Sequence, residues 1–135
     1  MIVVKIGGAQ GVGIENVCVD IAQLVSQGRP VVVVHGGSAE TNAISEKLGH
    51  PPRFVTHISG FTSRYTDRRT LEIFAMATRG LINTLIVEQL QKQGVNSIGL
   101  SGLDGRLMKA RRKDAIRIVE KGGIHAGGSA IGKFL

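Results

Sequence analysis

Cysteine and tryptophan are nearly missing from this sequence. The 135 residues include one cysteine, Cys18, and no tryptophan. A single cysteine cannot form an intramolecular disulfide, and no group of cysteines or histidines has the spacing of zinc ligands. We therefore expect no metal site of this kind, and we expect Cys18 to be a small core residue of a helix.

Long apolar runs and aromatic side chains are also scarce. No segment approaches the ~20 consecutive apolar residues of a membrane span, and Met1 leads directly into a strand-like segment without a signal-peptide pattern. Aromatic residues make up only 4% of the chain, so stacking surfaces for single-stranded nucleic acid are largely lacking. We expect a cytoplasmic protein with one main domain, binding neither membrane nor nucleic acid.

Acidic residues are outnumbered by basic ones. The chain has 17 lysines and arginines against 10 aspartates and glutamates, a formal net charge of +7. Such a surface attracts something acidic, and a nucleotide, a nucleic acid and an acidic protein all fit that description. Solvated surface clusters with local partners are the alternative. The densest clusters are Arg64, Arg68 and Arg69, and then Lys109, Arg111, Arg112 and Lys113.

The first part of the chain alternates between strand and helix patterns. Residues 1–6 are rich in β-branched side chains, residues 14–27 have apolar side chains at helical spacing, and Gly28 is a typical helix end. Residues 30–34 are apolar without alternation, which is typical of a strand buried on both faces. This order predicts parallel strands joined by helical crossovers.

The rest of the chain predicts further elements. A helix is expected over residues 40–48, an irregular hairpin over 53–63, helices over 66–76 and 81–93 separated near Gly80, and a strand over 95–100. Strand candidates follow at residues 107–113 and 116–119. We expect an α/β fold, a three-layer αβα sandwich with a mainly parallel but incomplete sheet. Its domain would cover residues 1–121, and the glycine-rich tail, residues 122–135, would be disordered.

Two glycine loops follow the first two strands. Gly7 and Gly8 come after the first, and Gly36 and Gly37 after the second. The carboxyl ends of parallel strands meet at one edge of a sheet, so these loops should lie side by side. Paired glycines allow backbone N–H groups to approach an anion, although each loop taken alone is equally consistent with a tight structural turn.

Two basic residues are candidates for the site. Lys5 interrupts an apolar strand, and a lysine buried there would cost several kcal/mol unless an anion met it. Its role would be to neutralise charge on a transferring phosphoryl group. Arg64 precedes a predicted helix, and its guanidinium could grip a carboxylate through two hydrogen bonds. A plain surface arginine is the alternative. His35, at the end of a strand, is expected to be packed and hydrogen-bonded rather than a general base.

Four segments together resemble the amino acid kinase family: V-K-I-G-G, V-V-V-H-G-G-S, S-R-Y-T-D and G-L-S-G-L-D-G. The sequence is similar to acetylglutamate kinases, and its H-G-G-S-A-E-T-N and G-H-P-P-R-F variants resemble still more the kinases that act on aminoadipate or glutamate carried by LysW, a small acidic protein. The resemblance implies ATP-dependent phosphorylation, with Mg²⁺, of a side-chain carboxylate to an acyl phosphate in lysine or arginine biosynthesis.

The resemblance also implies roles for particular residues. Lys5 would correspond to the lysine that stabilises the transferred phosphoryl group, and Arg64 to the arginine that holds the substrate carboxylate. Gly7 and Gly8 would bind phosphate, and Gly36 and Gly37 the substrate. LysW would be the protein partner, docked by the cluster Lys109, Arg111, Arg112 and Lys113, and a homodimer is expected.

Members of this family are about twice as long as this chain, and their second half supplies most of the ATP site. We therefore expect a truncated chain without activity of its own. Two alternatives stay open: a free N-acetylglutamate kinase, and a non-catalytic module that binds the acylated amino acid or LysW.

Overall fold

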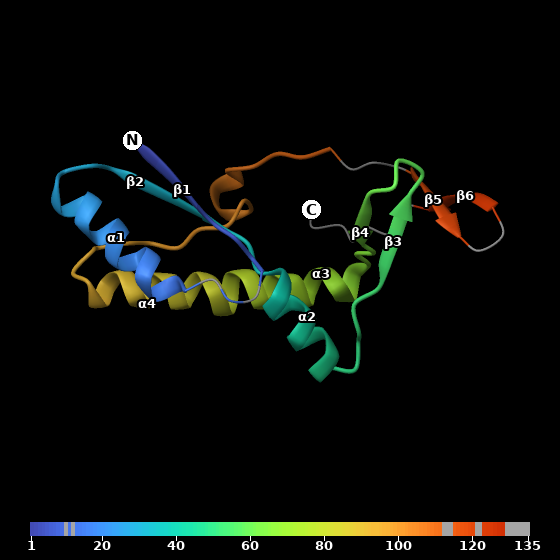
Figure 1. Cartoon of the computed structure of the whole chain (residues 1–135), viewed down its shortest axis with the longest axis horizontal. Coiled ribbons are helices and arrows are strands. Elements are labelled where there is room, and N and C mark those ends of the chain that lie inside the picture. Colours follow the sequence, from blue (N-terminus) through green and yellow to red (C-terminus); the bar gives the residue numbers. More distant parts are fainter. Residues whose placement is uncertain (10, 12, 112–114, 121–122, 129–135) are drawn as a thin grey trace.

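Two parallel strands form the first sheet. The computed structural model describes residues 1–9, 11, 13–111, 115–120 and 123–128, with side chains as far as Arg111. Strand β1 (Ile2–Ile6) pairs with β2 (Val31–His35), with Ile2 opposite Val31 and Ile6 opposite His35. Helix α1 (Ile14–Ser26) connects them, and Gly28 follows it at φ 75°. The predicted strand–helix–strand unit is confirmed (Figure 1).

Helices cover one face of this sheet. Helix α1 packs against α4 (Asn83–Lys92), and side chains of β1 and β2 lie against both. Cys18 is 1% exposed, as predicted, and burial raises the pKa of its thiol. The apolar core consists of Ile6, Cys18, Ile21, Ile82, Ile86 and Leu90.

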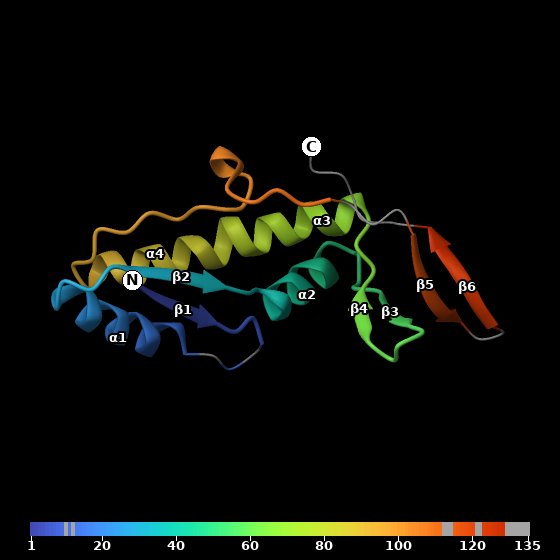
Figure 2. The ribbon, with the colours of Figure 1, turned by 90° about the horizontal axis from the view of Figure 1, so that it is seen from above.

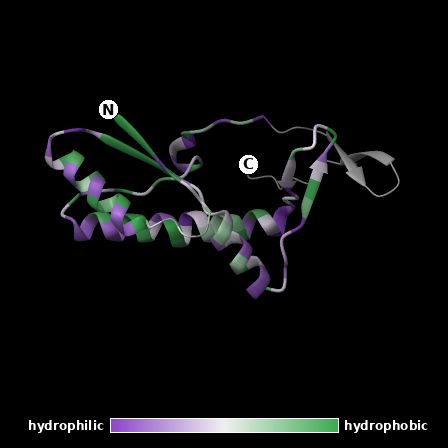
Figure 3. Ribbon diagram, viewed as in Figure 1, coloured by the Kyte–Doolittle hydropathy of each residue, from purple (hydrophilic) through white to green (hydrophobic). Residues whose placement is uncertain are grey.

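The opposite face of the sheet is exposed. Val3 is 66% exposed, and Val32 and Val34 are each 45% exposed, although both strands are hydrophobic along most of their length (Figure 3). The prediction that residues 30–34 form a strand buried on both faces is therefore wrong for this structure. These residues are apolar, as the pattern requires, but among the described residues helices pack on only one side of the strands (Figure 2).

A long helix runs through the middle of the molecule. Helix α3 (Arg68–Ala75) continues through a π-helical segment, η1 (Met76–Ile82), into α4 without a break. The predicted separation near Gly80 is wrong, because the wider π turn takes up Gly80 within the helix. By length and composition alone Arg68–Lys92 could cross a membrane. Its buried side chains are Thr70, Ile73, Ala77, Ile82, Ile86 and Leu90.

A second, antiparallel sheet lies at the other end of the long helix. After α2 (Ser38–Lys47), β3 (Phe54–His57) and β4 (Thr62–Arg64) form the predicted hairpin, with Gly60 at φ 81° in its turn. Strands β5 (Ala115–Glu120) and β6 (Gly123–Gly128) complete the order β4-β3-β5-β6.

The glycine-rich tail departs from its prediction. Gly123–Gly128 forms β6, paired with β5 from Glu120 opposite Gly123 to Ala115 opposite Gly128. The expectation of a tail without any element is therefore wrong for these residues, because pairing with β5 supplies the hydrogen bonds that the sequence alone does not show. The remaining tail positions, 122 and 129–135, lie outside the described residues.

The segment after α4 has no strand where two were predicted. Residues 95–100 and 107–111 have no strand partner among the described residues, and positions 112 and 113 of the second candidate lie outside them. A short 3-10 helix, η2 (Asp104–Arg106), lies in this segment. Asp104 accepts hydrogen bonds from the amide and hydroxyl of Ser101 at 2.7 and 2.8 Å, and pairs with Arg79 at 2.8 Å. The α/β class with a small, incomplete parallel sheet is confirmed.

Candidate functional site

The two glycine loops meet backbone to backbone, as their positions after parallel strands predicted. A Cβ atom placed on Gly36 would lie 2.8 Å from the nitrogen of Gly8 and 2.9 Å from its Cα. A Cβ placed on Gly8 would in turn lie 2.8 Å from the carbonyl carbon of Gly36. No side chain fits at either position without moving a backbone, which explains why both residues are glycine.

Hydrogen bonds fix one loop to the other. The carbonyl oxygen of Gly8 accepts from the Ser38 hydroxyl at 2.7 Å and from the Ala39 amide at 3.0 Å. The Gly36 amide donates to the carbonyl of Ile6 at 3.1 Å. The amides of Gly8 and Ser38 have no acceptor within the described part of the chain. Because Ser38 begins α2, these amides stand at the positive end of a helix dipole, an arrangement that suits an anion.

Gly37 brings the second loop against the long helix. A Cβ on Gly37 would lie 2.5 Å from Cδ1 of Ile82 and 2.9 Å from Cγ2 of Thr78, both in the π-helical segment. Thr41 reinforces the turn, since its amide and hydroxyl both donate to the carbonyl of Gly37. The loops therefore stand on a packed base formed by β1, β2 and η1.

Lys5 is placed differently from the prediction. It lies in β1 opposite Val34, on the uncovered face of the sheet, and it is exposed rather than buried. The argument from the cost of burying a lysine therefore does not apply to this structure. Lys5 still stands two residues before Gly7, at the carboxyl end of its strand, and has no ion-pair partner among the described side chains.

Arg64 reaches the second glycine loop from the hairpin. Its Nη2 donates to the carbonyl oxygen of Ser38 at 3.3 Å, and its guanidinium lies 5.5 Å from the centre of the Phe54 ring. Strand pairing sets Arg64 opposite Phe54. Residues that are 26 positions apart in the sequence are thereby brought together at the start of α2.

The second terminal nitrogen of Arg64 has no partner in the described part of the chain. Nη1 is buried and has no hydrogen-bond acceptor among the described residues. Burial lowers the pKa of this guanidinium, since desolvation disfavours its charged form. A buried cationic donor without an acceptor is costly, and an anion placed between Arg64 and the start of α2 would relieve that cost.

Other polar groups near the loops are already occupied. His35 is half-buried and its Nδ1 lies 3.1 Å from the carbonyl oxygen of Gly36, so the prediction of a packed, hydrogen-bonded histidine is confirmed.

An open groove of about 550 Å³ borders the site, but it contains neither Lys5 nor Arg64. It is lined by Ala9, Ser38, Ala39, Glu40, Asn42, Ala43 and Glu46. Its two carboxylates make it unsuitable for an anionic ligand.

The residues present fit part of what a kinase requires. The glycine loops, the start of α2 and the exposed ammonium group of Lys5 suit a phosphoryl group, and Arg64 suits a carboxylate. Among the described residues, no three histidine, cysteine, aspartate or glutamate side chains gather where they could hold a metal ion.

Sequence reasoning missed two residues, one in the site and one at the far end of α2. Ser38 links the two glycine loops and Arg64, because its hydroxyl donates to the carbonyl of Gly8 and its own carbonyl accepts from Arg64. A serine directly after two glycines at the start of a helix is a signal that could have shown this. His50 is the other, and its contact with Asp67 spans two elements in a way that spacing alone does not reveal.

Comparisons with known proteins agree on one group. The amino acid kinase family model matches residues 1–126, five residues beyond the expected domain boundary at 121. A [LysW]-aminoadipate kinase of Thermus thermophilus is 60% identical over 122 residues, which cover 90% of this chain and 45% of that relative. A [LysW]-aminoadipate kinase of Deinococcus radiodurans is 55% identical over 122 residues, covering 90% of this chain and 42% of the relative. The chain thus spans less than half the length of these curated relatives.

Proposed function

The chain belongs to the amino acid kinase family, and from that premise we propose that it forms the carboxylate-binding part of a kinase acting on LysW-carried aminoadipate or glutamate. The reaction transfers the terminal phosphoryl group of ATP to the side-chain carboxylate. A carboxylate oxygen forms a bond to phosphorus, the bond to the oxygen of ADP breaks, and an acyl phosphate results.

The position of Arg64 is the observation that carries this proposal. Its Nη2 bonds the carbonyl of Ser38 at the start of α2, and neither its Nη1 nor the Ser38 amide has an acceptor among the described residues. A carboxylate of the carried amino acid would take up that region, held by a charge-assisted hydrogen bond from Arg64. The reacting carboxylate would then lie toward the glycine loops.

Lys5 and the glycine loops serve the phosphoryl group. Catalysis of phosphoryl transfer depends mostly on positioning and on stabilising charge. The loops offer backbone donors that need no rearrangement because the contacts of Gly8 and Gly36 fix them. Lys5 adds a positive charge at the end of the same strand, and ATP, with Mg²⁺, supplies the phosphoryl group.

The carrier LysW is the proposed protein partner. The relatives' names specify a LysW-linked substrate, and the net charge of +7 favours a small acidic protein. Lys109 and Arg111 remain candidates for docking it, whereas Arg112 and Lys113 lie outside the described residues. We further propose that the protein acts in the cytoplasm, in lysine biosynthesis, and as a homodimer.

A second function is favoured by the uncovered sheet. Lys5 is exposed to water on that face, where the field of a lysine is strongly screened. A chain in this state would bind the carried amino acid through Arg64 without transferring a phosphoryl group. Binding without turnover is therefore the expected behaviour of these 135 residues alone.

A coupled assay of ADP release tests both functions. The purified chain is given ATP and magnesium with LysW bearing aminoadipate or glutamate, and separately with N-acetylglutamate. We expect binding of loaded LysW and no ADP release by the chain alone. ADP release that Lys5→Ala abolishes would show that the chain is itself a complete kinase. Faster turnover of N-acetylglutamate than of loaded LysW would show that the substrate is N-acetylglutamate and not a LysW-linked amino acid.

A further inference from the structure

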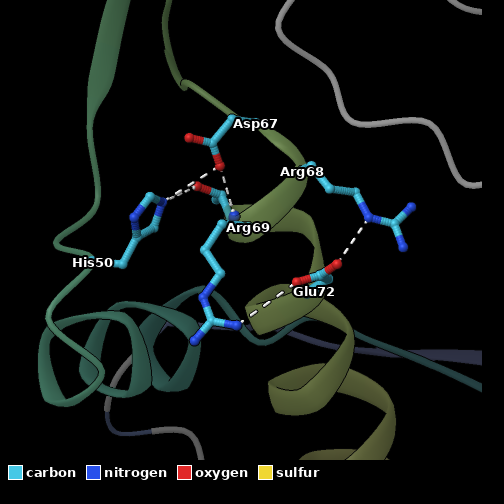
Figure 4. Close-up of polar contacts among 6 residues, drawn as sticks. His50, Asp67, Arg68, Arg69 and Glu72 are labelled. Carbon is cyan, nitrogen blue, oxygen red and sulfur yellow. Dashed lines mark hydrogen bonds and ion pairs between the residues drawn. The ribbon is translucent and has the colours of Figure 1, made fainter.

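A histidine joins the two ends of the segment that carries Arg64. His50 follows α2, and its Nε2 lies 3.0 Å from the hydroxyl oxygen of Thr70 and 3.4 Å from Oδ1 of Asp67 (Figure 4). Asp67 caps the long helix by accepting a hydrogen bond from the Thr70 amide at 2.7 Å. Asp67, Thr70 and His50 thus form one small network, which we call the latch.

Glu72 lies one helical turn beyond the latch and forms its own ion pairs. Glu72 takes up two arginines of the same helix, Arg68 at 2.9 Å and Arg69 at 3.7 Å (Figure 4). The contacts that the described residues give the Asp67 carboxylate come from Thr70 and His50.

The segment between the ends of the latch is an arm built around one hairpin. Residues 51–66 leave His50 and return to Asp67, and within them β3 pairs with β4. The amide of Tyr65 donates to the carbonyl of Arg53 at 2.8 Å, and the Arg53 guanidinium lies 4.7 Å from the centre of the Tyr65 ring. These contacts and the pairing of β3 with β5 hold the shape of the arm, and the latch joins its base to the long helix.

Helix α2 sets the distance between the base of the arm and the site. The latch lies just beyond the carboxyl end of α2, whereas Arg64 contacts the carbonyl of Ser38 at its amino end. Ten helical residues span about 15 Å. Small rotations at the base would move Arg64 away from Ser38, to which one hydrogen bond of 3.3 Å joins it.

We propose that His50 is a positioning residue that, through Asp67 and Thr70, holds the 51–66 arm so that Arg64 meets its carboxylate at the start of α2. This inference rests on the proposed function, because Arg64 is the residue being positioned. Closing the base of a flexible loop restricts it before any ligand binds, so less conformational freedom is lost on binding.

Nuclear magnetic resonance of the full chain tests the latch without turnover. The Nε–Hε signal of Arg64 is assigned as the one missing from Arg64→Lys, and exchange of the Tyr65 amide reports on the base of the arm. In His50→Ala we expect the Arg64 signal to move to the position of freely exposed arginines and Tyr65 exchange to accelerate roughly tenfold or more. His50→Gln, which keeps a hydrogen-bond donor, should restore both.

Two controls separate positioning from loss of fold. Arg69→Ala alters a charge beside the latch without touching it and should leave both signals unchanged. Cys18, the single cysteine, is buried in α1 and should stay protected from a thiol reagent in every variant. If His50→Ala exposes Cys18, the comparison is repeated with His50→Asn, whose shorter amide falls short of Thr70.

The outcomes decide the proposal on its own terms. Unchanged Arg64 and Tyr65 signals in a His50→Ala chain that still protects Cys18 would overturn it, as would failure of His50→Gln to restore the signals. Failure of the proposed function gives a different result, since the wild-type chain would then not bind loaded LysW, whether or not the latch holds the arm.

Discussion

At the scale of single residues, the glycine contact between the two loops is the tightest constraint on the site. Gly36→Ala would push a methyl group to 2.8 Å from the nitrogen of Gly8, so we expect a loss of about 1–3 kcal/mol in the free energy of unfolding, measured with urea. Gly80→Ala is the matched control, because nothing lies within 4 Å of its Cβ position. That change should stabilise by roughly 0.5–1 kcal/mol, and equal effects from both variants would contradict the packing described.

Asp67 is the residue that begins the long helix. Asp67→Ala removes the acceptor of the Thr70 amide, so the free energy of unfolding should fall by about 1 kcal/mol. Asp67→Ser retains a capping oxygen and should recover most of that loss. Thermal denaturation of the three proteins measures this, and an Ala variant as stable as the wild type would show that the cap contributes nothing.

Two carboxylates make the free energy of unfolding depend on pH in the acidic range. The Thr70 amide, above all, lowers the pKa of Asp67, and the Ser101 amide that of Asp104. Groups whose pKa is lower in the folded than in the unfolded chain stabilise it above the unfolded value, about 3.9, and this contribution is lost as the pH falls through the folded pKa. The urea concentration at the unfolding midpoint should decrease as the pH is lowered below about 4. The decrease should be smaller in Asp67→Asn, which still caps the helix. An unchanged pH profile in that variant would contradict the assignment.

Single-residue sequence reasoning succeeded where geometry follows from local order. Gly8 and Gly36 were expected to meet because both follow parallel strands, and they do. Lys5 was expected to be buried, but its exposure depends on what covers the sheet, which no local pattern states. Its catalytic role stays a prediction, as do the substrate-binding roles of Gly37 and Arg64.

At the scale of elements, α4 supplies much of the apolar core. Ile86 is 3% exposed and its neighbour Leu85 is 39% exposed. Ile86→Ala should cost about 2–5 kcal/mol of unfolding free energy, and Leu85→Ala about 1 kcal/mol or less. Chemical denaturation compares the two, and similar losses would mean that the helix faces the sheet differently.

The elements that sequence reasoning got wrong share one cause. The helix was expected to break at Gly80, yet glycine only lowers helix propensity, and packing of Ala77 and Ile82 holds the helix together across it. Residues 95–100 have the composition of a strand but pair with no strand in the parts of the chain that the structure describes. In both cases tertiary contacts decided, and local composition could not show them.

At the scale of the whole molecule, the first sheet has one bare apolar face. Val34→Glu should lower binding of a hydrophobic dye to the chain while shifting its melting temperature by less than about 2 °C, because the side chain is already 45% exposed. Loss of the folded state in this variant would show that the face is covered in solution, for example by a second copy of the chain.

The family was the property of the molecule that the sequence predicted best. The bare face of the first sheet was the property that it predicted least. The glycine loops, Lys5 and Arg64 carried the family's pattern, and the family model matches residues 1–126. The bare sheet face was not expected from the alternation of strands and helices, since parallel sheets are normally covered on both sides.

Carboxylate recognition at Arg64 is the central claim, and a titration of the ¹⁵N-labelled chain with loaded and with bare LysW tests it most directly. We predict that LysW bearing aminoadipate shifts the amide signals of Gly36, Gly37 and Ser38 together with the Arg64 Nε–Hε signal. Bare LysW should leave these signals unmoved, and Arg64→Lys should weaken binding of the loaded carrier roughly tenfold or more. Identical shifts from loaded and bare LysW, or no shift at Arg64, would contradict the account.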